Sequence, residues 1–174
     1  MRENLLFTIV VFVAMTFTAC NQNKPEEPKF VDLGLPSGTL WKNQKETSYR
    51  NYEGQYTYDE AIETFGNQLP TQEQWQELIS KCEWTHMGTG LYKVTGPNGN
   101  FIEIKHHLTL FCNGKVDNGE WDRGRYWSST KTKYDDEKAY YLYIDWDSNN
   151  EEIFIELGSG EVCGGLGVIL VKNP

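Results

Sequence analysis

Positively charged residues are few in this sequence of 174 residues. Sixteen lysines and arginines stand against 25 aspartates and glutamates, which gives a formal net charge of −9. The cations do not gather into a basic patch, and clustered lysine and arginine supply most of the affinity of proteins for nucleic acid. We therefore expect no nucleic-acid partner.

Cysteine and histidine are also scarce, with four and three residues. No CxxC pair and no Cys/His spacing typical of zinc sites is present. His106 and His107 are adjacent, so on a strand their side chains would point to opposite faces. We expect no Cys/His metal site, and nothing in the sequence indicates a cofactor.

Long hydrophobic runs are missing except near the N-terminus. The run Leu5–Met15 follows Arg2 and is too short for a comfortable transmembrane helix, which is typical of a signal-peptide core. Residues 17–20, Phe-Thr-Ala-Cys, then resemble a bacterial lipoprotein signal, in which small residues precede a cysteine that becomes lipidated. We expect removal of residues 1–19 as a lipoprotein signal peptide and anchoring through Cys20. The alternative is ordinary secretion with a chance cysteine.

The polar, proline-bearing segment that follows predicts a flexible tether over residues 20–28 and one globular domain over residues 29–174. The membrane is then contacted only through the N-terminal lipid. Lipidation of Cys20 leaves Cys82, Cys112 and Cys163, so at most one disulfide can form, and its pairing is open.

Aromatic residues and glycine are plentiful, at 14% and 16 residues, which indicates a turn-rich, β-containing domain. Two helices are predicted around residues 68–70. Thr57 with Glu60 and Thr71 with Gln74 form capping boxes at their starts. Apolar stripes follow at i, i+3, i+4 and i+7 spacing: Tyr58, Ala61, Ile62 and Phe65 in the first helix, and Trp75, Leu78, Ile79 and Cys82 in the second.

Strands dominate the rest of the domain. Alternating or continuous apolar patterns predict strands at residues 30–35, 39–41, 91–94, 101–104, 108–111, 126–130, 139–146, 151–157 and 167–171. Residues 113–125 are polar and glycine-rich and predict a long loop. Two short helices followed by many strands indicate an α+β fold with the helices packed on twisted antiparallel sheets.

The hairpin at residues 139–157 carries the candidate binding surface. Alternation directs Leu142 and Ile144 to the core and leaves aromatic and acidic side chains on the other face. Aromatic faces supply contact area for sugars or proteins, and carboxylates accept hydrogen bonds. With the adjacent loop, this face predicts a ligand-binding set of Trp121, Arg123, Tyr141, Tyr143 and Phe154. A merely solvent-facing sheet is the alternative.

The tip of the same hairpin offers a calcium candidate. The spacing of an EF-hand loop is followed by Asp145, Asp147, Asn149, Glu151 and Glu156, although Asn150 stands where the loop needs glycine. Both flanks alternate like strands, whereas an EF-hand needs helices. A polar hairpin tip is therefore the favoured interpretation, and no metal site is predicted.

No catalytic constellation is found. Cys82 lies on the apolar helix stripe and is expected in the core, and Ser128 and Ser129 have no His or Asp partner nearby in the sequence. Neighbouring acid pairs such as Asp135-Asp136 indicate solvated charge. We expect a protein that is not an enzyme.

Four segments together resemble one known family, the Fibrobacter succinogenes major paralogous (FISUMP) domain: Val31–Trp41, Gln68–Trp75, Tyr92–Asn100 and Tyr126–Thr130. The resemblance implies a C-type-lectin-like fold and a surface lipoprotein of Bacteroidota. Glu26-Glu27 also resembles the acidic export tags of such lipoproteins, which implies the outer membrane and exposure at the cell surface; the side of the membrane is left open. The chain departs from the family pattern at residues 105–110 and 167–171.

Three classes of function follow from these features. A module that recognises a carbohydrate or a surface protein is favoured, because reactive groups are missing and a tethered lectin-like domain implies recognition. A structural or fimbria-like surface subunit is one alternative. An enzyme related to the formylglycine-generating enzymes, which share the Leu-Pro-Thr-x-x-x-Trp corner, is the other.

Overall fold

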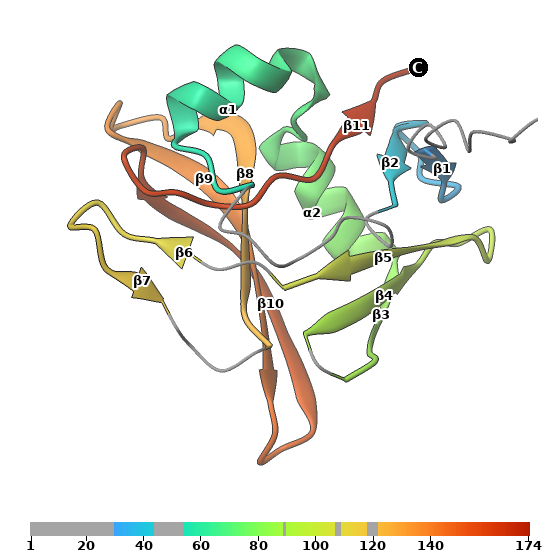
Figure 1. The fold of residues 1–174 in the computed structure, drawn as a ribbon. Coiled ribbons are helices and arrows are strands. Elements are labelled where there is room, and N and C mark those ends of the chain that lie inside the picture. The colour runs from blue at the N-terminus through green and yellow to red at the C-terminus, as the bar shows by residue number, and fades with distance from the viewer. Residues whose placement is uncertain (1–29, 44–53, 89, 107–108, 118–121) are drawn as a thin grey trace, which may run out of the picture.

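A computed structural model of the protein describes residues 30–43, 54–88, 90–106, 109–117 and 122–174. The expected signal peptide (1–19), the tether (20–28) with Cys20, and Trp121 lie outside these residues. These residues form two short α-helices and small sheets of mostly antiparallel strands (Figure 1). The prediction of a mixed fold with helices and antiparallel sheets is confirmed.

Both predicted helices form. Helix α1 (Tyr58–Phe65) begins after the Thr57–Glu60 capping box and ends at Gly66, whose φ of 50° suits glycine and whose backbone N–H bonds back to the helix. A 3-10 turn, η1 (Gly66–Gln68), leads to α2 (Gln72–Lys81), which begins at the Thr71–Gln74 capping box. Local capping chemistry therefore sets both helix starts, as the sequence predicted.

Eleven strands are found in the described residues, in four sheets. The sheets have the strand orders β1-β2-β11, β10-β9-β8, β3-β4-β5 and β6-β7. The strands are β1 (Phe30–Asp32), β2 (Leu40–Lys42), β3 (Glu83–His86), β4 (Leu91–Thr95), β5 (Phe101–Lys105), β6 (Thr109–Leu110), β7 (Val116–Asp117), β8 (Gly124–Lys131), β9 (Lys138–Asp147), β10 (Glu152–Glu161) and β11 (Val171–Lys172).

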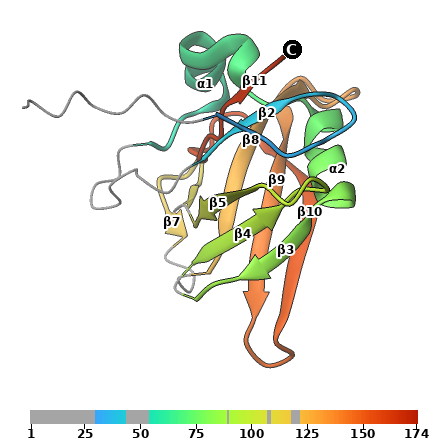
Figure 2. The same ribbon diagram turned by 90° about the vertical axis from the view of Figure 1, so that its right-hand side faces the viewer.

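The β10-β9-β8 sheet is buried on both faces over part of its length. On its inner face, Leu142 and Ile144 join a core with Trp75 of α2 and with the β3-β4-β5 sheet. On its outer face, Trp127 and Ala139 join a second core with α1. Figures 1 and 2 show α1 and the β3-β4-β5 sheet on different sides of the long β9–β10 hairpin. The remainder of the outer face is left open to solvent.

Three predictions about strands are corrected by the structure. Strand β3 follows α2 directly and was missed, because four residues give too short an alternation to detect. Residues 167–171 are buried or partly buried but form no single strand; regular pairing is limited to β11, and the preceding residues alternate between the two cores. The expected long loop at 113–125 contains β7 and the start of β8.

None of the described helices has the length and apolar character needed to cross a membrane.

Candidate functional site

Cross-strand registers define the outer face of the β10-β9-β8 sheet. Arg125 of β8 lies opposite Tyr143 of β9, which lies opposite Glu156 of β10. In the next row Asp145 lies opposite Phe154. Because side chains alternate along strands, these residues share one face, as the sequence predicted for the hairpin.

A carboxylate organises part of this face. Oδ2 of Asp145 accepts hydrogen bonds from Nε of Arg123 at 2.9 Å and from the hydroxyl of Tyr143 at 2.8 Å. Burial, followed by the bond to Asp145, raises the pKa of Tyr143 to about 12. The Tyr143 ring meets Phe154 edge-on, with centroids 5.9 Å apart. Three predicted site residues, Arg123, Tyr143 and Phe154, thus form one connected group.

Arg125 lies between two aromatic rings. Its guanidinium carbon is 5.0 Å from the centroid of Tyr143 and 5.8 Å from that of Phe111, which follows β6. Its Nη1 donates a hydrogen bond to Oγ1 of Thr109 at 3.1 Å. The cation–π contacts and this bond link the β6–β7 hairpin to the outer face of the sheet.

A cavity of about 340 Å³ opens beside Arg125, between the β6–β7 hairpin and the sheet. Its volume falls in the range of small-molecule sites. It combines aromatic rings with a guanidinium, a carboxylate and a hydroxyl. The lining residues that matter here are Thr109, Phe111, Arg125, Trp127, Tyr141 and Glu161.

Tyr141 forms part of this cavity and is half-buried, whereas an exposed position was expected. Its ring packs on glycines: a Cβ added to Gly158 would lie 2.7 Å from the ring, and one added to Gly160 would lie 3.0 Å from it. Trp127 meets the ring edge-on at 6.3 Å. The difference arises because the second core extends over this end of the outer face.

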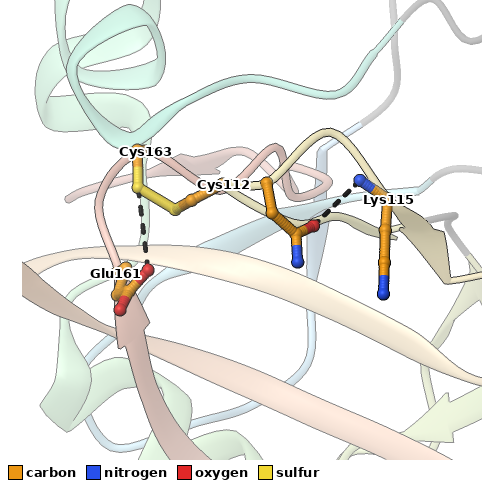
Figure 3. Close-up of a disulfide and its surroundings, with 5 residues drawn as sticks. Cys112, Lys115, Glu161 and Cys163 are labelled. Carbon is orange, nitrogen blue, oxygen red and sulfur yellow. Dashed lines mark hydrogen bonds between the residues drawn. A yellow bond between two sulfur atoms is a disulfide. The ribbon is translucent and has the colours of Figure 1, made fainter.

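The sequence left open which cysteines pair, and in the structure a disulfide joins Cys112 to Cys163. Figure 3 shows it connecting the β6–β7 turn to the segment that follows β10, with Glu161 beside it. Oε2 of Glu161 lies 3.8 Å from Sγ of Cys163. Cys112 also lines the cavity. The disulfide therefore fixes one wall of the candidate site.

Cys82, the remaining thiol among the described residues, is half-buried against the first core. Burial, with a contribution from Glu77, raises its pKa to about 11. A thiol with this pKa holds very little thiolate at neutral pH. The expectation that Cys82 packs as a core residue is consistent with this position.

The calcium candidates lie on a strand hairpin. Asp147 accepts hydrogen bonds from the backbone N–H groups of Asn149 and Asn150, which lower its pKa, and Asp145 is engaged by Arg123 and Tyr143. Within the described ranges, three His, Cys, Asp or Glu ligand atoms converge only at Cys112, Glu161 and Cys163. The two sulfur atoms there are joined in the disulfide.

Hydroxyl groups near the sheet have structural partners. Oγ of the buried Ser128 accepts a bond from the backbone N–H of Thr130, and Ser129 Oγ donates to the carbonyl of Pro70. The Ser129 bond ties β8 to the corner before α2, and the Ser128 bond is internal to β8.

Sequence reasoning missed Phe111, Arg125, Trp127 and Glu161 as site residues. Arg125 and Trp127 carried a usable signal, because they alternate with Tyr126 once β8 is recognised to begin at Gly124. Phe111 carried none, because only the disulfide and the β6–β7 hairpin bring it to the sheet. Glu161 ends β10, which extends beyond the strand predicted at residues 151–157.

Comparisons of the chain with protein-family models, with curated proteins and with solved structures find no match.

Proposed function

We propose that this protein is a surface lipoprotein whose domain binds a carbohydrate in the cavity beside Arg125 and performs no catalysis. The observation that carries the proposal is the make-up of that cavity. The rings of Phe111 and Tyr141 lie next to the polar groups of Arg125 and Glu161, and the fully buried Trp127 lies beneath them. Sugars present apolar C–H faces and hydroxyl groups, which match rings and hydrogen-bonding groups respectively.

The rigidity of the site supports this proposal. Arg125 is held between two rings, Tyr141 packs on glycines, and the disulfide fixes the β6–β7 hairpin. A site that is ordered before its ligand arrives loses less conformational entropy on binding.

The fold assignment and the location belong to the same proposal. The resemblance of four segments to the FISUMP domain favours a C-type-lectin-like fold. The signal ending at Cys20 favours a lipid anchor in the outer membrane with the domain at the cell surface. Incorporation of a labelled lipid precursor into the wild-type protein, and its loss in Cys20→Ala, would support the anchor; label retained by Cys20→Ala would refute it.

Glycan-array binding by the full-length protein in detergent tests the function. We expect binding of a defined set of glycans, and we expect Phe111→Ala to weaken it about thirtyfold or more. Self-association of the protein without any glycan binding would favour a structural surface subunit. Turnover of a thiol-bearing peptide would favour an enzyme related to the formylglycine generators.

A further inference from the structure

A second, separate groove lies on the other side of the β9–β10 hairpin. It has a volume of about 540 Å³ and runs between β3 and that hairpin. Figure 2 shows the tip of the hairpin projecting beyond the β3-β4-β5 sheet. The lining residues are Trp84, Thr85, His86, Trp146, Glu151, Glu152, Ile153 and Ile155.

The floor of this groove is apolar because the inner face of the hairpin extends past the core. Trp146, Ile153 and Ile155 are partly buried against the first core cluster and still line the groove. From β3, His86 stacks on Trp146 with ring centroids 4.3 Å apart. Strand β3 therefore covers these side chains only in part, and an apolar strip stays open to a partner.

The acidic and basic side chains that line the groove are all acidic, apart from one histidine. Glu151 and Glu152 lie at the hairpin tip and are exposed, and the lining includes neither lysine nor arginine. His86 is engaged by Asp122, with Nε2 3.1 Å from Oδ1. Carboxylates next to indole rings suit a cationic side chain, since each attracts ammonium and guanidinium groups.

The backbone around the groove suits an extended ligand. β3 and β10 are edge strands, each paired on one side only in the described part of the chain. An edge strand presents unpaired N–H and C=O groups to which an extended peptide can add. A strand-like segment is therefore the ligand shape that uses both the edge and the apolar floor.

We propose that this groove binds an extended, basic segment of a partner protein. Lysine or arginine side chains of the segment lie over the indole rings of Trp84 and Trp146 and are attracted by the exposed carboxylates of Glu151 and Glu152 at the rim of the groove. Its backbone pairs with the edge of β3 or β10. The site is distinct from the carbohydrate cavity, so a surface protein with both would bridge a glycan and a protein.

The test uses the full-length protein in detergent and a short labelled peptide of alternating lysine and threonine, followed by fluorescence anisotropy. Glu151→Gln/Glu152→Gln is compared with Glu63→Gln/Glu137→Gln, which makes the same charge change at exposed positions outside the groove. We expect the groove variant to bind about five- to thirtyfold more weakly, as befits two exposed ion pairs, and the control to bind like wild type.

Three results would overturn the proposal: equal weakening in both double variants, equal binding of a peptide with glutamate in place of lysine, or no binding of the lysine peptide. Amide hydrogen exchange gives an independent readout of the location. Slower exchange in residues 83–86 or 152–161 on binding supports the groove, and slowing confined to other segments contradicts it.

Discussion

At the scale of single residues, Trp75 shows how closely local pattern and tertiary burial agree. Its place on the helix stripe predicted burial, and its side chain is fully buried with the ring 5.0 Å from that of Trp41. The grouping of the cavity residues, in contrast, could not be predicted from local pattern. Phe111 is separated from Arg125 by a turn and a strand, so no periodicity in the sequence links them.

Trp75→Ala should lower the free energy of unfolding by about 3 to 5 kcal/mol, because it removes a large buried side chain and leaves a cavity. Phe154→Ala is the matched control, since Phe154 is 51% exposed, and it should change the value by about 0.5 kcal/mol or less. Urea titrations of both variants measure the effect. Equal stability of Trp75→Ala and wild type would contradict the assigned core.

Tyr143 predicts a loss of stability at alkaline pH. Its pKa is about 12 in the folded protein against 10.0 for the ordinary side chain, so the folded state keeps a proton that the unfolded state has lost. The contribution is fully present below pH 10 and disappears as pH rises toward 12. Urea titrations should show a smaller loss between about pH 9 and about pH 11 for Tyr143→Phe than for wild type. An equal loss would show that Tyr143 is not responsible.

At the scale of elements, the helices were predictable and the outer elements were not. The Thr57–Glu60 and Thr71–Gln74 capping boxes are local, and both form as the sequence indicated. The β6–β7 hairpin depends on long-range partners instead, through Gly165 and through the disulfide from Cys112. The alternation of apolar and polar residues along a strand reflects only local structure. It cannot reveal contacts with residues some fifty positions away in the sequence.

The disulfide should stabilise the protein as a link between these elements. Its cysteines are separated by 51 positions, and closing a loop of this size restricts the unfolded chain. Cys112→Ala/Cys163→Ala should lower the free energy of unfolding by about 2 to 4 kcal/mol. A reducing agent should have the same effect on wild type and none on the double variant, and denaturation curves that overlay for all four samples would contradict this role.

At the scale of the whole molecule, the β10-β9-β8 sheet separates two cores and two candidate binding sites. The sequence predicted one exposed face from the alternation of Tyr141 and Tyr143, but α1 and the segment after β10 cover the Tyr141 end of that face. Which part of a sheet face is covered depends on the path of the other chain segments over it. The alternation of residues along a strand holds no information about that path. The cavity beside Arg125 forms at the border of this cover.

Affinity for a glycan found on the array tests the central claim most directly. The affinity is measured by calorimetry for wild type and two variants. Phe111→Ala truncates an exposed ring inside the cavity, and Tyr134→Ala truncates an exposed ring outside it. We predict that Phe111→Ala loses about 2 kcal/mol or more of binding free energy, on the order of a thirtyfold change, and that Tyr134→Ala binds like wild type. Unchanged affinity of a folded Phe111→Ala protein would contradict the assignment of the cavity as the carbohydrate site.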